Sequence, residues 1–158
     1  MKIIYPGSFD PITYGHLDII ERISKKFNKV YVAILNNKNK NSLFTIEERK
    51  KIILDSCKHL NNVEVVSFSG LLADFAKELD CNLIARGLRE VSDYEKEVQM
   101  ALMNKELYSD LETLFLVSNY KYSFLSSSLV KEIISFGGDI DKFVSPMAVQ
   151  MMKEKYSE

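Results

Sequence analysis

The 158-residue sequence lacks the features that define several large protein classes. It has only two cysteines, Cys57 and Cys81, with no C-x-x-C spacing and no histidine cluster, so a structural zinc site is not expected. No apolar run approaches the roughly 20 residues of a membrane span. The opening residues MKIIYPGSFD contain no apolar stretch long enough for a signal peptide. We therefore predict a reduced, cytoplasmic protein without a membrane partner.

An excess of charge of one sign is also missing. The chain has 21 Lys and Arg residues against 22 Asp and Glu residues, a net charge of -1. A protein that holds nucleic acid mainly through phosphate contacts needs a strong basic excess, so we expect no nucleic-acid partner. A small anionic ligand needs only a few local cations and stays possible. The 46% hydrophobic and 27% charged shares are typical of a globular chain, and the length predicts one domain over residues 1–158.

Short apolar runs alternate with segments of helical period. Within one run, residues 31–35 are apolar at successive positions, which predicts a central strand of a parallel sheet, buried on both faces. Helical spacing is found near residues 17–27, 46–60, 71–79, 94–102, 127–136 and 146–155. The alternation predicts an α/β fold: one Rossmann-like, doubly wound domain with a five-stranded parallel sheet. The five predicted strands are Lys2–Tyr5, Val30–Leu35, Val63–Phe68, Asn82–Ala85 and Thr113–Val117.

Polar and glycine-containing segments follow four of the five predicted strands. In open α/β sheets, ligands bind beyond the carboxyl ends of the strands, so we expect these segments to meet at one edge. Their cations, hydroxyls and glycines suit a phosphate. The segments are residues 6–16 (PGSFDPITYGH), the loop with Lys38 and Lys40, residues 86–89 (RGLR) and Ser118–Ser128.

The familiar phosphate-loop motifs are absent, because the chain has neither G-x-x-x-x-G-K-[ST] nor G-x-G-x-x-G. Thr13 is instead a predicted N-cap that places Gly15 and His16 in the first turn of a helix. Free backbone N–H groups and the helix dipole favour an anion there. His16 is therefore a candidate functional residue. The other histidine, His59, lies near the end of a predicted helix, and we assign it no function.

Three segments together carry a resemblance to a known family: GSFDPITYGH (7–16), RGLR (86–89) and SFLSSSLVK (123–131), supported by FTIEER (44–49). They resemble the nucleotidyltransferase superfamily with its [HT]-x-G-H motif and, more narrowly, the bacterial phosphopantetheine adenylyltransferase family. The resemblance covers nearly the whole chain. It implies reversible transfer of an adenylyl group from ATP to 4'-phosphopantetheine, giving 3'-dephospho-coenzyme A and pyrophosphate. It also implies Mg²⁺ as cofactor and a homohexamer.

The resemblance further implies roles for individual residues. His16, Lys40 and Arg89 match catalytic positions, and His16 matches the residue that stabilises the transition state. Residues that match positions binding 4'-phosphopantetheine are Ser8, Lys40, Leu72 and Arg86. Residues that match ATP-binding positions are Ser8, Phe9, His16, Gly87, Leu88, Arg89, Glu97, Tyr122, Ser123, Phe124, Leu125, Ser126, Ser127 and Ser128. No residue matches a metal ligand.

Local sequence leaves simpler interpretations open for some of these residues. Residues 36–42 (NNKNKNS) are typical of a solvated loop, and Lys38 keeps that interpretation. Leu72 also fits the apolar stripe of a helix, and Glu97 fits a helical surface charge. The serines at 126–128 could cap a helix, a role compatible with phosphate binding because both use a helix start.

Two alternative functions remain open at this point. The first is another activity of the same superfamily, a cytidylyltransferase or a nicotinamide-mononucleotide adenylyltransferase. Cytidylyltransferases usually carry an R-T-x-G-[IV]-S-[ST]-[ST] block, whereas this chain has YSFLSSS at 122–128. The second is a non-catalytic, nucleotide-binding regulator. A regulator would have no reason to keep His16, Lys40, Arg86 and Arg89 together.

Overall fold

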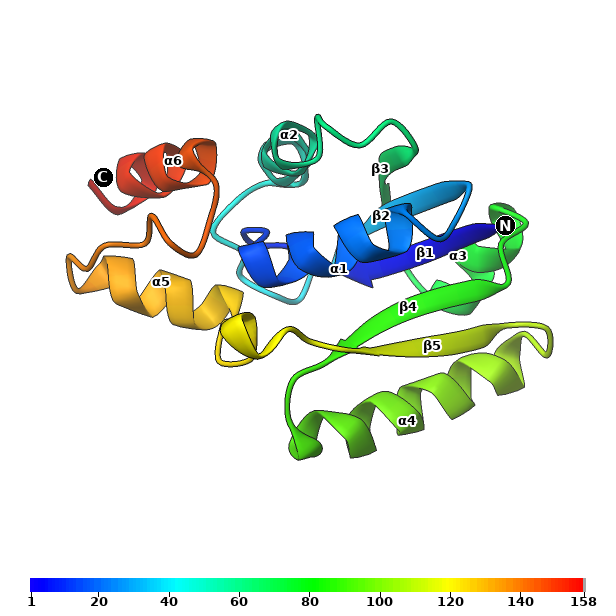
Figure 1. Ribbon diagram of the computed structural model, residues 1–158. Helices are drawn as coiled ribbons and strands as arrows, with labels where there is room; N and C mark the ends of the chain where they lie inside the picture. The colour runs from blue at the N-terminus through cyan, green and yellow to red at the C-terminus, as the bar shows by residue number, and fades with distance from the viewer. Residues whose placement is uncertain (158) are drawn as a thin grey trace.

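The computed structural model describes residues 1–157. Its centre is one sheet of five parallel strands in the order β3-β2-β1-β4-β5, which confirms the predicted doubly wound, Rossmann-like fold (Figure 1). The strands are β1 (Lys2–Gly7), β2 (Lys29–Leu35), β3 (Val63–Phe68), β4 (Leu83–Leu88) and β5 (Glu112–Val117). The helices are α1 (Tyr14–Ser24), α2 (Ile46–Ser56), α3 (Leu72–Glu78), α4 (Val91–Leu107), the 3₁₀ turn η1 (Tyr120–Tyr122), α5 (Ser127–Ser135) and α6 (Pro146–Ser157).

Alternate residues of the central strands point to opposite faces of the sheet, because side chains in a strand have a period of two. Ile3 and Tyr5 join a buried cluster with residues of α1 and α2, and this cluster continues into α5 and α6. Ile4 joins a second cluster with residues of α3. Both faces of β1 are therefore covered. In β2, Val32, Ala33 and Ile34 are fully buried, as predicted for a central strand.

The strand order reverses at β1, which leaves a crevice between β1 and β4. β1 pairs with β2 over six residues but with β4 only at Ile4 and Ile84. Beyond that pair, the Arg86 side chain donates a hydrogen bond from Nη1 to the Pro6 carbonyl at 2.8 Å. Open α/β sheets bind ligands at such a switch point, beyond the carboxyl ends of the strands. Helices α5 and α6 lie beyond that end of β1 (Figure 1).

Strand β4 is longer than the sequence predicts. Arg86, Gly87 and Leu88 belong to the strand, not to a turn after it, because they pair with Phe115, Leu116 and Val117 of β5. The apolar run that predicts this strand stops before Arg86 and Gly87, so the sequence pattern does not indicate that the strand continues. The long ladder with β5 is what keeps them extended. The prediction that the fourth strand ends at Ala85 is therefore wrong.

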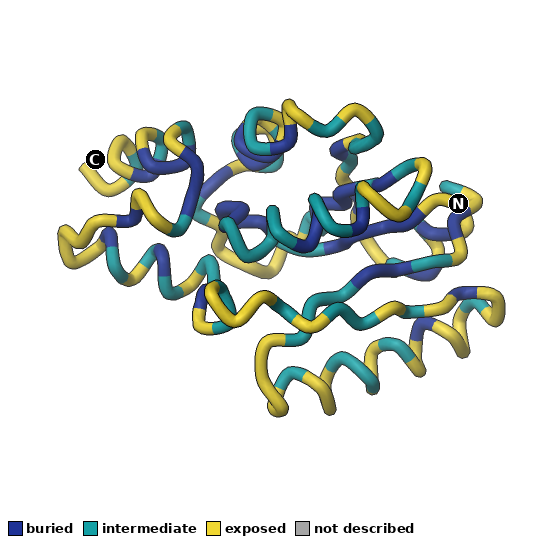
Figure 2. The backbone as a smooth tube through the Cα atoms, in the orientation of Figure 1, coloured by how far each residue is buried: buried dark blue, intermediate teal, exposed yellow. Residues whose placement is uncertain are grey.

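Helix α4 differs more strongly from expectation. Its predicted apolar stripe includes Tyr94 and Leu102, yet these side chains are 53% and 65% exposed. The buried residue of this helix is the polar Asn104. The helix covers β4 and the edge strand β5, whose Leu114 and Val117 are also exposed. Figure 2 shows many more exposed residues along α4 and β5 than along β1. No helix among residues 1–157 is both long and apolar enough to cross a membrane.

Candidate active site

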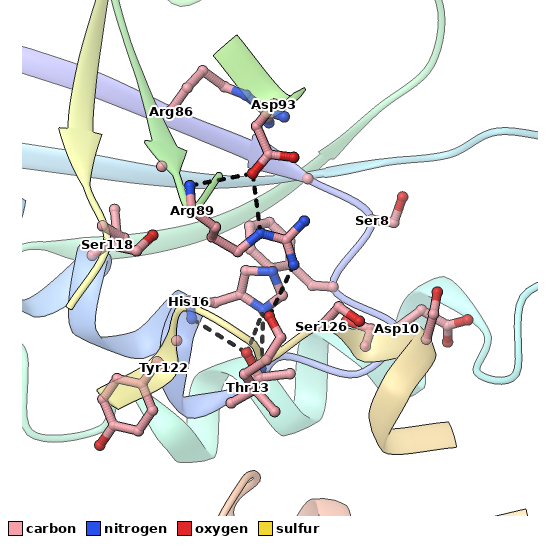
Figure 3. A pocket seen from close by; sticks show the side chains of 18 of the residues that line it. Ser8, Asp10, Thr13, His16, Arg86, Arg89, Asp93, Ser118, Tyr122 and Ser126 are labelled. Atoms are coloured by element: carbon pink, nitrogen blue, oxygen red, sulfur yellow. Dashed lines mark hydrogen bonds and ion pairs between the residues drawn. The ribbon is translucent and has the colours of Figure 1, made fainter. Parts of the chain in front are cut away.

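A polar pocket opens at the carboxyl ends of β1 and β4, where the crevice was predicted (Figure 3). It draws side chains from the β1–α1 loop, the loop before α2, β4, α4 and the start of α5. Of the residues predicted to act in binding or catalysis, those lining it are Ser8, Phe9, His16, Lys40, Arg86, Gly87, Arg89, Glu97, Tyr122, Leu125, Ser126, Ser127 and Ser128. Segments remote in sequence therefore meet at one site.

The predicted cap of α1 holds the imidazole of His16. The Thr13 side chain accepts the backbone N–H of His16 at 3.4 Å, and the Thr13 backbone N–H donates to Nδ1 of His16 at 3.0 Å. The ring also packs edge-on against Phe9, with ring centroids 5.2 Å apart. Phe9 adopts the left-handed backbone conformation at φ 47°, which turns its ring to the imidazole at the start of α1. The cap thus fixes both the place and the orientation of His16.

The same contacts determine which nitrogen of His16 carries the proton. A backbone N–H can only donate, so Nδ1 accepts and the proton of the neutral ring lies on Nε2. Burial lowers the pKa of His16 from 6.5 to about 4, helped by the positive charges of Arg89 and Arg86. His16 is therefore neutral at pH 7 and presents an Nε2–H donor.

Arg86 is held rigidly by three contacts. Its Nε and Nη2 donate to the two carboxylate oxygens of Glu97 at 2.8 and 2.6 Å, and Nη1 donates to Pro6. Burial lowers the pKa of Arg86, but the hydrogen bonds and charge of Glu97 outweigh this effect and the pKa ends above its ordinary value. The planar fork of arginine suits such a bidentate pair. The resemblance implied that Glu97 contacts ATP; in the structure its direct partner is Arg86.

Arg89 joins two further parts of the pocket. Its Nη1 donates to the Leu125 carbonyl at 2.9 Å, and its Nε lies 3.4 Å from Asp93 Oδ2 in the first turn of α4. Figure 3 shows its guanidinium group next to the His16 ring. The two guanidinium groups, each also paired with a carboxylate, and the neutral imidazole thus form one rim of the pocket that is rich in hydrogen-bond donors. Such a rim attracts an anion with several oxygens.

The start of α5 carries the predicted serines. Ser126 caps the helix, since its hydroxyl accepts the Leu129 N–H at 3.1 Å, which confirms the capping interpretation. Ser127 donates to the Pro11 carbonyl at 2.7 Å, so α5 is tied to the loop before α1. Ser128 is exposed and lines the pocket. The remaining N–H groups of this helix start face an anion favourably.

Four predicted residues do not line the pocket. Leu72 begins α3 and packs against the second core cluster, in agreement with the core interpretation. Leu88 ends β4. Ser123 donates to the Tyr120 carbonyl at 2.9 Å, and Phe124, which is 55% exposed, packs edge-on against Phe143. Contacts of these four with a substrate stay predictions.

The sequence reasoning missed three charged residues of the pocket: Asp93, which pairs with Arg89, and also Asp10 and Lys131. The Asp10 carboxylate is buried and accepts the ammonium group of Lys131 at 3.1 Å. Asp10 and Lys131 lie inside segments that carry the family resemblance, 7–16 and 123–131, which is the signal that could have found them, whereas Asp93 lies outside these segments. Within residues 1–157, no group of three or more His, Cys, Asp or Glu side chains is placed to hold a metal ion.

The sequence of the chain is similar to a protein family and to named relatives from several bacteria. Residues 4–133 match the cytidylyltransferase-like family. A phosphopantetheine adenylyltransferase of Finegoldia magna is 54% identical over 157 residues, 99% of this chain and 97% of the relative. Relatives of the same name from Heliobacterium modesticaldum and Prochlorococcus marinus are 52% and 53% identical, over 98% and 99% of this chain and 92% and 99% of theirs.

Solved structures resemble the fold at much lower identity. A nicotinic acid mononucleotide adenylyltransferase of Plasmodium falciparum complexed with NaAD has a TM-score of 0.71 at 18% identity, covering 99% of this chain and 97% of that one. The same protein complexed with APC has a TM-score of 0.70. At this identity the likeness shows the fold alone.

Proposed function

The chain belongs to the phosphopantetheine adenylyltransferase family, and we propose that it transfers an adenylyl group from ATP to 4'-phosphopantetheine, giving 3'-dephospho-coenzyme A and pyrophosphate. This is the penultimate step of coenzyme A biosynthesis. One observation about the site supports this proposal more strongly than any other observation. A neutral Nε2–H donor on His16 lies beside the fixed guanidinium groups of Arg86 and Arg89 at the switch point of the sheet.

The reaction is a displacement at the α-phosphorus of ATP. An oxygen of the substrate phosphate forms a bond to the α-phosphorus, and the bond from that phosphorus to the oxygen leading to the β-phosphorus breaks. Pyrophosphate leaves with the bonding electrons. The attacking oxygen is already ionised near neutral pH, so the site needs no strong general base. Catalysis then depends on positioning and on stabilising negative charge in the transition state.

The residues of the pocket divide between these tasks. We assign His16 Nε2–H to a non-bridging oxygen of the α-phosphate, where negative charge increases during attack. Arg86 suits the phosphate of 4'-phosphopantetheine, because Glu97 and Pro6 already fix its orientation. The start of α5 and Arg89 suit the triphosphate. Lys40, exposed on the loop before α2, also lines the pocket and can approach the phosphates.

We propose Mg²⁺ as the cofactor, entering with ATP. Mg²⁺ binds through one or two carboxylates together with substrate phosphates and water, and needs no cage made of protein alone. The pocket's acids are already paired with cations: Asp10 with Lys131, Asp93 with Arg89, and Glu97 with Arg86. When bound, Mg²⁺ would neutralise phosphate charge. The side chains described above would hold and orient the two substrates.

We also propose a homohexamer that works in the cytoplasm. The exposed apolar side chains of α4 and β5 support an assembly, because a monomer rarely leaves a large apolar surface open to water. They include Val91, Met100, Leu102, Met103, Leu107, Leu114 and Val117. Cys57 and Cys81 are buried free thiols, which fits a reducing compartment.

A pyrophosphate-release assay with three substrate mixtures tests the proposed function. Each contains Mg²⁺, with ATP and 4'-phosphopantetheine, ATP and nicotinamide mononucleotide, or CTP and glycerol phosphate. We expect turnover only in the first. Turnover confined to another mixture would assign the chain to a different nucleotidyltransferase activity. Binding of ATP without turnover in any mixture would instead indicate a regulator.

A further inference from the structure

The loop between β1 and α1 is tied to two distant segments through one buried carboxylate. Asp10 is 4% exposed, and both of its oxygens are engaged. Oδ2 accepts the Leu43 backbone N–H at 2.8 Å and the Lys131 ammonium group at 3.1 Å, while Oδ1 accepts the Phe44 N–H at 2.9 Å. A buried charge is stable only when its partners satisfy it in this way. Asp10 thus joins the loop before α2 and helix α5 to the β1–α1 loop, which lines the pocket.

A second buried charge makes the reciprocal contact. Arg49 of α2 is 5% exposed, and its Nη1 donates to the Ser8 carbonyl at 2.9 Å. The carboxylate of Asp10 therefore contacts residues 43–44, and the guanidinium group of Arg49 in α2 contacts the backbone of Ser8. Two sets of charge-assisted hydrogen bonds, one from each side, therefore hold these segments together. We call residues 8–10, 43–44, Arg49 and Lys131 the latch.

The latch lies at the end of the loop that carries Lys40. The loop begins where the Asn36 N–H donates to the Phe68 carbonyl at 2.8 Å, and it ends at the two N–H groups held by Asp10. Lys40 lies three residues before Leu43, and residues 37–42 are exposed. The position of Lys40 relative to His16 thus depends on where Asp10 holds the end of the loop. Ser8, at the other side of the latch, lines the same pocket.

We propose that Asp10 is a positioning residue for adenylyl transfer: through the latch it holds the Lys40 loop so that Lys40 and His16 act on the same phosphate group. This inference rests on the proposed function. Asp10 acts through Lys40 and the start of α5 and does not touch the reacting atoms. The pocket's other acids each orient a single arginine, whereas Asp10 fixes a whole loop.

Asp10→Asn tests the proposal because the amide keeps the shape but replaces one acceptor oxygen by a donor. The amide nitrogen would face either Phe44 N–H or the Leu43 and Lys131 donors, so one set of contacts is lost. We expect kcat/KM to fall about tenfold to a hundredfold, the loss typical of a misplaced catalytic group. In the Lys40→Ala background the same change should cost less than about threefold, since Lys40 is the group it positions. A full loss in that background would overturn the proposal.

Amide hydrogen exchange gives a readout that does not require catalysis. In Asp10→Asn, the Leu43 and Phe44 amides should exchange faster while the strands of the sheet stay protected. Asp55→Asn, a partly exposed carboxylate on α2 paired with Lys58, is the matched control and should change neither exchange nor turnover. Unchanged exchange at Leu43 and Phe44 would contradict the latch even in an active enzyme. An inactive wild-type enzyme would contradict the proposed function alone.

Arg49→Lys provides a second variant if Asp10→Asn fails to fold. Lysine keeps the charge but cannot reproduce the paired donors that reach Ser8 and Thr45. We expect a loss of kcat/KM in the same direction, again reduced in the Lys40→Ala background. Equal losses with and without Lys40 would show that Arg49 acts independently of the loop, against the proposal.

Discussion

At the scale of single residues, the neutral state of His16 is the feature with the clearest chemical consequence. A protonated imidazole would add a third positive charge to a rim that already holds Arg86 and Arg89. The lowered pKa keeps that charge away and leaves a neutral Nε2–H donor in the free enzyme. The ring thus enters the reaction as a hydrogen-bond donor already oriented by the helix cap.

Histidine NMR tests this state directly. We expect the nitrogen shifts of His16 at pH 7 to be those of the Nε2–H tautomer, with a titration midpoint near 4. The His59→Gln variant identifies which signal belongs to His16. Between pH 6.5 and 4 the unfolded chain binds a proton at this position that the folded chain does not, so stability should fall as the pH falls through this window. A midpoint near 6.5, or an Nδ1–H tautomer, would contradict the interpretation.

The sequence predicts part of this chemistry. Thr13 and His16 are three residues apart, so local spacing was enough to predict the cap. The charge state of His16 depends on its burial in the folded chain and on two arginines about 70 positions further along the sequence, and a local sequence pattern shows neither. Asp10 was missed for the same reason, because its partners Leu43, Phe44 and Lys131 lie 33 to 121 positions away.

At the scale of helices and strands, α4 positions Arg86 of β4 through Glu97. The bidentate pair fixes the guanidinium group across the gap between helix and sheet. We expect Glu97→Gln to raise KM for 4'-phosphopantetheine roughly tenfold, because a charge-assisted pair is worth more than a neutral one. KM for ATP should change little. Steady-state kinetics in both substrates measure the difference.

Glu95→Gln removes an exposed carboxylate from the same helix and is the control for Glu97→Gln. It should leave both KM values unchanged. A Glu97→Gln effect on KM for ATP alone would favour the direct ATP contact that the family resemblance implies.

The length of β4 also depends on a contact between segments that are distant in the sequence. The residues RGL (86–88) extend the strand because they pair with β5. A single sequence does not show that β5 lies beside them, so the end of β4 could not be predicted from it.

At the scale of the whole molecule, the main feature is the apolar surface of α4 and β5, which a single chain leaves exposed to water. The sequence predicted that α4 would bury a stripe against the core, and its residues are apolar as that requires. The sheet ends at β5, however, so part of the helix has no described neighbour within residues 1–157 to cover it. The same pattern that suggested a core position therefore suits contact between copies.

Leu102→Glu tests the proposed hexamer. This side chain is 65% exposed, and a charge buried at an interface without a partner opposes association. Light scattering after size exclusion should give a hexamer for the wild type and a smaller species for the variant. Asn61→Asp adds the same charge at an exposed position between α2 and β3, away from α4 and β5 in the chain, and should remain a hexamer. A wild-type monomer, or a Leu102→Glu hexamer of wild-type stability, would contradict the assignment of this surface.

The most direct test of the account is the turnover of His16→Ala with ATP, Mg²⁺ and 4'-phosphopantetheine, compared with His59→Ala. If catalysis depends on the neutral donor in the donor-rich rim, kcat should fall about 10²–10³-fold in His16→Ala, as for the loss of an oxyanion donor, with the fold retained. His59→Ala should match the wild type, because His59 does not line the pocket and its side chain contacts Glu21. A folded His16→Ala enzyme that turns over within a few-fold of the wild type would contradict the account.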